Sequence, residues 1–170
     1  MSKTFQKGEH VCYGTNGVCL IEDICEMAVA KEKEQFYVLR PLHDRHSTFY
    51  IPIRNDELTE KIRNPVTREK IDAMIETVRT DYGEWIVDRK ARMEAFRIVL
   101  RETDPLEVLR LCVLLSNHKQ LLADNGKRLA PSDESVLKQV QDLTDTEFGF
   151  ALDIPANEVK PYVTKRLKSK

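Results

Sequence analysis

The spacing of apolar residues changes near residue 60, and this change constrains the fold more than any other feature of the sequence. Before it, short segments are rich in aromatic and β-branched residues, which favour strands. After it, apolar residues such as Ile71 and Ile75 recur at helical spacing. The sequence therefore predicts a segregated α+β protein, with a small β domain at residues 1–60 and an all-α helical bundle at residues 61–170.

The β domain has several strand candidates separated by turn signals. Segments rich in β-forming residues flank the Asn16-Gly17 pair, which favours a tight turn, and residues 35–42 and 47–54 are two further candidates. The charged segment 28–35 is expected to connect strands. Short strands at this spacing predict a small twisted barrel or a half-open sheet. Because Pro52 cannot donate to a strand ladder, the last strand is predicted to be an edge that can pair with another chain.

Helix-start signals divide the second domain. The spacing predicts a first helix over residues 67–81. Asp81 and Glu84 resemble a capping box, which would place Trp85 in the first turn of the next helix. Later helices are expected to start at Asp104, followed by proline, and near Ser132, and a short last helix is expected near the C-terminus.

The sequence lacks the spacings that mark phosphate-binding loops, serine-hydrolase elbows and zinc proteases. Its cysteines form no CxxC pair and are predicted to be small buried apolar residues; they are Cys12, Cys19, Cys25 and Cys112. His43 and His46 lie in a predicted turn without a third metal ligand nearby. We therefore expect a protein that is not an enzyme and that uses no cofactor or metal.

The overall charge also limits the possible partners. A net charge of −1 means that contact with nucleic acid would have to come from a local basic patch. No apolar run approaches the roughly 20 residues of a membrane span, and the first ten residues lack the apolar core of a signal peptide. The sequence thus predicts a cytoplasmic protein without a membrane segment.

The only tryptophan, Trp85, is followed closely by Arg89, Lys90 and Arg92. This arrangement suits contact with nucleic acid. The basic side chains would neutralise phosphates, and the indole ring would stack on a nucleobase or wedge at a base step. Tryptophan is also usually largely buried, so packing of Trp85 between helices explains the same pattern. The residue pattern leaves both interpretations open.

With Phe5, Gly8, Glu9 and Val11 near its start and Trp85 ahead of several basic residues, the chain resembles the CarD family of bacterial transcription regulators over nearly its whole length. Segments 36–55, 84–96 and 105–152 are similar to the paired strands, the tryptophan-led basic helix and the last helices of that family. The start of the chain follows the family's F-x-x-G-[DE]-x-V-x-Y-x-x-x-G-V pattern at Phe5, Gly8, Glu9, Val11, Tyr13, Gly17 and Val18.

The resemblance implies a Tudor-like N-terminal barrel, similar to the RNA polymerase-interacting domain of the transcription-repair coupling factor. This domain would bind the β subunit of bacterial RNA polymerase through an edge strand. The helical domain would meet promoter DNA at the upstream edge of the transcription bubble and stabilise the open complex. There Trp85 would wedge into the minor groove, while Arg89, Lys90 and Arg92 would hold phosphates.

The residues expected to face the polymerase are Met27, Thr48, Phe49, Tyr50, Ile51 and Ile53. Met27 and Tyr50 stand where some relatives carry arginines, so apolar anchors would replace charged ones beside the backbone pairing of the edge. A polymerase-binding adaptor that never touches DNA is the alternative function. We expect a monomer, although an exposed edge strand can also pair with a second copy of the chain.

Overall fold

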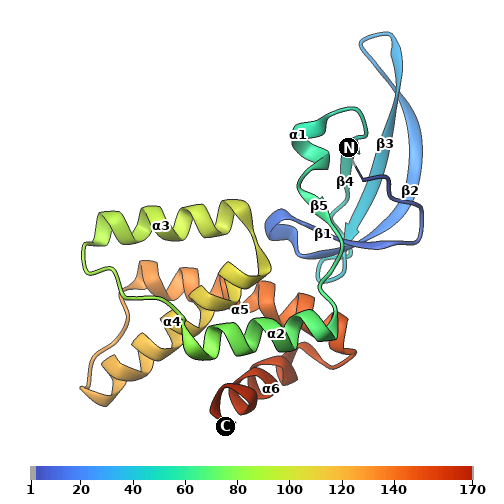
Figure 1. The fold of residues 1–170 in the computed structure, drawn as a ribbon. Coiled ribbons are helices and arrows are strands. Elements are labelled where there is room, and N and C mark those ends of the chain that lie inside the picture. Colours follow the sequence, from blue (N-terminus) through green and yellow to red (C-terminus); the bar gives the residue numbers. More distant parts are fainter. Residues whose placement is uncertain (1–2, 170) are drawn as a thin grey trace. The chain divides into compact units, whose positions relative to one another are not determined.

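The computed structural model describes residues 3–169. The chain forms two compact units, Met1–Pro65 and Val66–Lys170. The first unit contains all the strands and the second contains only helices among the described residues, so the fold is α+β (Figure 1). The predicted boundary stood at residue 60, whereas the units separate after Pro65. Each unit is described by itself below.

The first unit is a five-stranded antiparallel sheet with the order β4-β3-β2-β1-β5. Its elements are β1 (His10–Tyr13), the 3-10 turn η1 (Gly14–Asn16), β2 (Val18–Val29), β3 (Glu32–Pro41), β4 (Phe49–Pro52), α1 (Asp56–Thr59) and β5 (Ile62–Arg63).

The sheet is open, because β4 and β5 do not pair. The prediction of a closed barrel is therefore wrong, and the alternative prediction of a half-open sheet is confirmed. Closure would require β4 to pair with β5, and these two edge strands have only four and two residues. The chain between them forms α1, whose start is fixed by the Asn55 side chain accepting a hydrogen bond from the Leu58 amide.

The longest ladder joins β2 to β3, and it corrects the connection predicted at residues 28–35. Strand pairing continues to Val29 and Glu32, so the turn consists of Ala30 and Lys31 alone. Both turn residues have positive φ, 50° and 72°, as a two-residue hairpin with the strand-matching twist requires. Glu32, Lys33 and Glu34 of this segment therefore lie on β3, where Glu32 and Lys33 are exposed to solvent.

The core of the sheet is built from one face of the strands. Ile21, Leu39 and Tyr37 are at most 2% exposed and pack together in one cluster. The Tyr37 hydroxyl accepts a hydrogen bond from the Phe5 amide at 3.1 Å, which satisfies the polar end of a buried ring. The N-terminal segment is thereby fastened to the sheet.

The second unit consists of five helices: α2 (Arg68–Thr80), α3 (Arg89–Glu102), α4 (Pro105–Asp124), α5 (Pro131–Leu152) and α6 (Ala156–Lys168). The cap at Asp104 is confirmed, because its carboxylate accepts from the Leu106 and Glu107 amides. The start at Ser132 is wrong: Pro131 occupies the first helical position of α5, where a missing amide hydrogen costs nothing.

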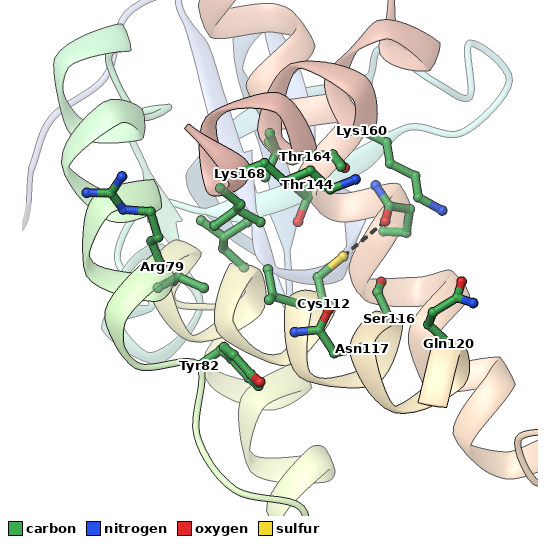
Figure 2. Close-up of a pocket in the computed structure, with 16 residues that line it drawn as sticks. Arg79, Tyr82, Cys112, Ser116, Asn117, Gln120, Thr144, Lys160, Thr164 and Lys168 are labelled. Carbon is green, nitrogen blue, oxygen red and sulfur yellow. Dashed lines mark hydrogen bonds between the residues drawn. The ribbon is translucent and has the colours of Figure 1, made fainter. Parts of the chain in front are cut away.

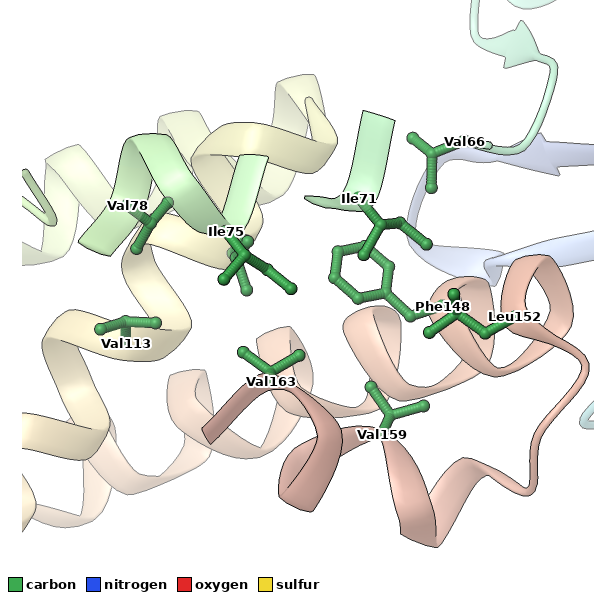
Figure 3. Packing of buried hydrophobic residues seen from close by; sticks show 10 residues of the cluster. Val66, Ile71, Ile75, Val78, Val113, Phe148, Leu152, Val159 and Val163 are labelled. Carbon is green, nitrogen blue, oxygen red and sulfur yellow. The ribbon is translucent and has the colours of Figure 1, made fainter. Parts of the chain in front are cut away.

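Two apolar clusters hold the helices together. The first joins α2, α4, α5 and α6 through residues such as Ile71, Ile75 and Phe148, which point toward one another in Figure 3. The second joins α3, α4 and α5 around Phe96 and Leu115. Within residues 3–169, no helix combines the length and apolar character needed to cross a membrane.

Candidate functional site

An irregular connection of residues 81–88, here called the tryptophan loop, carries Trp85 between α2 and α3 (Figure 1). The predicted helix start at Asp81 and Glu84 is therefore wrong. Asp81 instead ends α2 and accepts a hydrogen bond from the Gly83 amide at 2.9 Å. Gly83 has a φ of +86°, which interrupts a helix, and α3 is capped by Asp88, which accepts from the Ala91 amide.

The Trp85 ring lies flat on His118 of α4, with ring centroids 3.6 Å apart and planes 8° from parallel. Trp85 also packs edge-on with Phe96 of α3, with ring centroids 6.3 Å apart. The Arg92 guanidinium lies 4.7 Å from the centroid of the Trp85 ring. Trp85 is therefore partly buried, with one face covered by an imidazole and a cation nearby. The ring is held in one orientation rather than projecting freely.

Arg92 fastens this arrangement from inside the unit. Its Nε and Nη2 atoms donate to the two carboxylate oxygens of Asp133, each at 3.0 Å, and Nη1 donates to the carbonyls of Ile86 and Val87 at 3.1 Å. Arg92 is 7% exposed and Asp133 2% exposed. A fork-shaped cation thus ties α3 to the first turn of α5 and to the tryptophan loop.

The structure does not place Arg92 for its predicted phosphate contact, because its side chain is buried and its three nitrogens donate four hydrogen bonds within the unit. Arg89 and Lys90, by contrast, are exposed at the start of α3. Arg89 donates a long hydrogen bond of 3.5 Å to the Ser132 hydroxyl and keeps its charge at the surface. These two bases remain placed where a phosphate could reach them.

The far end of the tryptophan loop carries apolar side chains that the sequence analysis did not single out. Val87 is 85% exposed and Ile86 is 38% exposed, although both carbonyls are held by Arg92. A rigid backbone with exposed apolar side chains is suited to insertion between base steps or against a partner. The signal that could have found this surface is Val87 itself, because a valine directly before the N-cap Asp88 lies outside the helix and does not belong to its apolar face.

His118 is a further residue that the sequence analysis missed. It lies on α4, and only the tertiary fold brings it under Trp85. Burial lowers the pKa of His118, the nearby Asp133 carboxylate opposes this shift, and the Arg92 guanidinium adds to it. His118 is thus held toward its neutral form, which stacks on an indole without placing a second cation beside Arg92.

In the first unit, β4 is an edge whose free side can be assigned. The Ile53 amide donates to the Gln35 carbonyl at 3.0 Å, and Ile51 lies opposite Tyr37 in the ladder. Since hydrogen-bonded positions alternate in an antiparallel pair, Ile51 and Ile53 direct their backbone groups toward β3. Tyr50 therefore directs its N–H and C=O away from the sheet, while Pro52, the next outward position, has only a carbonyl to offer.

This alternation separates the residues predicted to contact the polymerase. Ile51 is 4% exposed, and its side chain packs in the sheet core rather than at the surface where the predicted contact would need it. Phe49 and Ile53 are partly buried against the same core and share the inward side. Tyr50, 52% exposed, and the exposed Thr48 are the two residues that present side chains at this edge.

Met27 belongs to a different part of the sheet. It lies near the tip of the β2–β3 hairpin opposite Glu34, whereas Tyr50 lies on β4 opposite Val38. Alternation places Met27 and Tyr50 on the same face, but β3 lies between them, and their partners on β3, Glu34 and Val38, are four residues apart along that strand. The structure therefore does not bring the two proposed apolar anchors together.

The cysteines are free thiols, with Cys12, Cys19 and Cys112 buried and Cys25 partly buried. Burial raises the pKa of Cys19 and of Cys112 to about 12, which makes both thiols unreactive at neutral pH. In the described part of the chain, no three His, Cys, Asp or Glu side chains converge as a metal site.

Comparison with known proteins identifies the first unit. Residues 5–66 match the family model of the CarD-like/TRCF RID domain, so the chain carries an N-terminal domain of this family. The predicted CarD-like resemblance is confirmed for this part of the chain. A search of curated proteins found none that matches the chain.

Proposed function

We propose that this protein is a non-enzymatic bacterial transcription regulator that binds the β subunit of RNA polymerase through β4 and stabilises the open promoter complex through the tryptophan loop. The observation that carries the proposal is an unpaired edge strand within a CarD-like/TRCF RID domain. An edge strand recognises a partner by adding a strand, with the backbone supplying affinity and exposed side chains supplying specificity.

Tyr50 is the centre of the proposed polymerase contact, because both its backbone groups and its side chain face outward. Replacing it by Asp places a charge against the partner strand and is expected to weaken binding to purified β subunit at least tenfold. Val29→Asp is the matched control, since Val29 is also exposed but lies at the hairpin tip. Equal binding by the Tyr50→Asp protein and the unaltered protein would show that another surface is used.

The tryptophan loop is the proposed DNA contact. Trp85 stacked on His118 presents a braced ring, Val87 extends the apolar surface, and Arg89 and Lys90 supply phosphate contacts beside it. Binding only the distorted upstream junction favours the open promoter over the closed one. A difference of about 1.4 kcal/mol in affinity for the two states shifts their ratio tenfold.

Open-complex lifetime with purified polymerase tests this half of the proposal. Trp85→Ala is expected to shorten the lifetime severalfold, but it also removes a ring from the second apolar cluster. Val87→Ser is the cleaner variant, because Val87 is 85% exposed and its replacement leaves the Trp85–His118 stack in place. Lifetimes unchanged by both variants, with polymerase binding intact, would remove the DNA contact.

A polymerase-binding adaptor without DNA contact is the second candidate function. It is favoured by the partly buried Trp85 and by Arg92, whose charge is compensated internally by Asp133. Quenching of Trp85 fluorescence by acrylamide in the polymerase complex distinguishes the two functions. Added promoter DNA should protect the ring if it contacts the groove, whereas an adaptor would show the same quenching with and without DNA.

A further inference from the structure

We propose that the helical unit contains a binding site for an amphipathic organic anion, in a cavity of about 480 Å³ between α2, α4, α5 and α6. Cavities of several hundred Å³ with apolar walls and a few convergent polar groups are the usual form of small-molecule sites. Tyr82 of the tryptophan loop also lines the cavity, but Trp85 and His118 do not, and the proposed polymerase contact belongs to the other unit.

The apolar wall of the cavity is the side of the first helical cluster that borders it. Val78 of α2, Val113 of α4 and Val163 of α6 belong both to this wall and to the cluster in Figure 3. Leu109 and Leu167 complete the wall. A ligand with a hydrocarbon or aromatic body would extend an existing core and remove apolar surface from water.

The charged residues that line the cavity indicate which class of ligand it would bind. Its charged residues are all basic, namely Arg79, Lys160 and Lys168, and no Asp or Glu lines it, although the chain as a whole carries a net charge of −1. Both lysines come from α6, and Figure 2 shows them among the residues that line the cavity. A cavity with cations and none of the chain's many acids in its lining favours an anionic head group.

Arg79 contributes less than the lysines to this preference. Its guanidinium pairs with Glu76, outside the lining, and donates to the Ser169 carbonyl. Lys160 and Lys168 are exposed, and Asp145 is the acidic group whose charge acts near Lys160. The head group of the ligand is therefore assigned to the two lysines.

Uncharged polar groups line the remainder of the wall. Ser116, Asn117 and Gln120 follow one side of α4, and Thr144 and Thr164 face them from α5 and α6 (Figure 2). These groups can hydrogen-bond a carboxylate, sulfonate or phosphate and the first atoms of its body. Cys112 donates to Gln141 at 3.0 Å and is an unreactive buried thiol, so binding would be non-covalent.

Calorimetric titration of the full chain with decanoate, below its micelle concentration, tests the proposal. Decanol has the same chain length without charge, and decylammonium reverses the charge. Decanoate is expected to bind at least tenfold more tightly than decylammonium. The Lys160→Gln/Lys168→Gln protein is expected to lose roughly two- to fivefold in decanoate affinity per lysine and to bind decanol as before.

Two further variants locate the site. Ser116→Leu places a larger side chain in the lining of the cavity and should weaken decanoate and decanol alike, with the helical content checked by circular dichroism. Lys165→Gln is the matched control, because Lys165 is exposed on α6 but does not line the cavity. Absence of decanoate binding, equal binding of the three probes, or equal weakening by Lys165→Gln and the double variant would overturn the proposal.

Discussion

Replacing Arg92 by Ala tests the central feature of the helical unit, its buried tie between α3, α5 and the tryptophan loop. The change removes both hydrogen bonds to Asp133 and both to the loop carbonyls of Ile86 and Val87. It leaves the Asp133 carboxylate, 2% exposed, without its cation. It also removes the guanidinium that lies 4.7 Å from the centre of the Trp85 ring.

The magnitude follows from burial. Breaking a buried ion pair by removing one partner costs about 3–5 kcal/mol, because the remaining charge is left uncompensated. We therefore expect Arg92→Ala to lower the free energy of unfolding of the helical unit by about 4 kcal/mol. Since whole domains are commonly stable by only about 5–15 kcal/mol, this variant should leave the unit marginally folded.

Urea unfolding followed by far-ultraviolet circular dichroism measures this loss, since the helices dominate the signal. Arg89→Ala is the matched control, because Arg89 is exposed and should change stability by less than about 0.5 kcal/mol. Asp133→Ala and the Arg92→Ala/Asp133→Ala protein complete a double-mutant cycle. A loss below about 1 kcal/mol for Arg92→Ala would refute the internal role of Arg92 and restore it as a candidate phosphate contact.

Two other predictions concern the same surface. Because the pKa of His118 is lower in the folded protein, a proton binds His118 more strongly in the unfolded chain. The contribution of neutral His118 to the free energy of unfolding is therefore present above about pH 6.5 and is lost as the pH falls through the folded pKa. Urea unfolding at pH 7.5 and 5.5 should therefore show a smaller acid-induced loss for His118→Phe than for the unaltered protein, and identical losses would contradict this reasoning. Replacing Arg89 and Lys90 by Gln should flatten the salt dependence of promoter binding by about two phosphate contacts, a change of roughly 1.8 in the log–log slope, whereas an unchanged slope would show that neither base meets the backbone.

Much of the fold follows from local chemistry that a sequence displays directly. The helix at Arg68–Thr80, the cap at Asp104 and the edge character of the strand with Pro52 all depend on residues near one another in the chain. The local pattern failed at Glu84, because a capping-box spacing does not reveal that Gly83 has a positive φ. The choice between a barrel and an open sheet also depended on whether two distant strands meet.

The sequence by itself determined that the chain has a β part and a helical part, that its N-terminal pattern is CarD-like, and that Trp85 stands beside a group of bases. Only the tertiary structure decided the roles within that group. Arg92 and Lys90 are two residues apart, yet Asp133, 41 positions beyond Arg92, turns one base inward while the other stays in solvent. His118, 33 positions beyond Trp85, supplies the surface on which the tryptophan lies. Periodicity shows which residues share a face of a helix, but it does not identify the residues of another helix that pack against that face. Those partner residues determine whether a charge is compensated within the protein or left for a ligand.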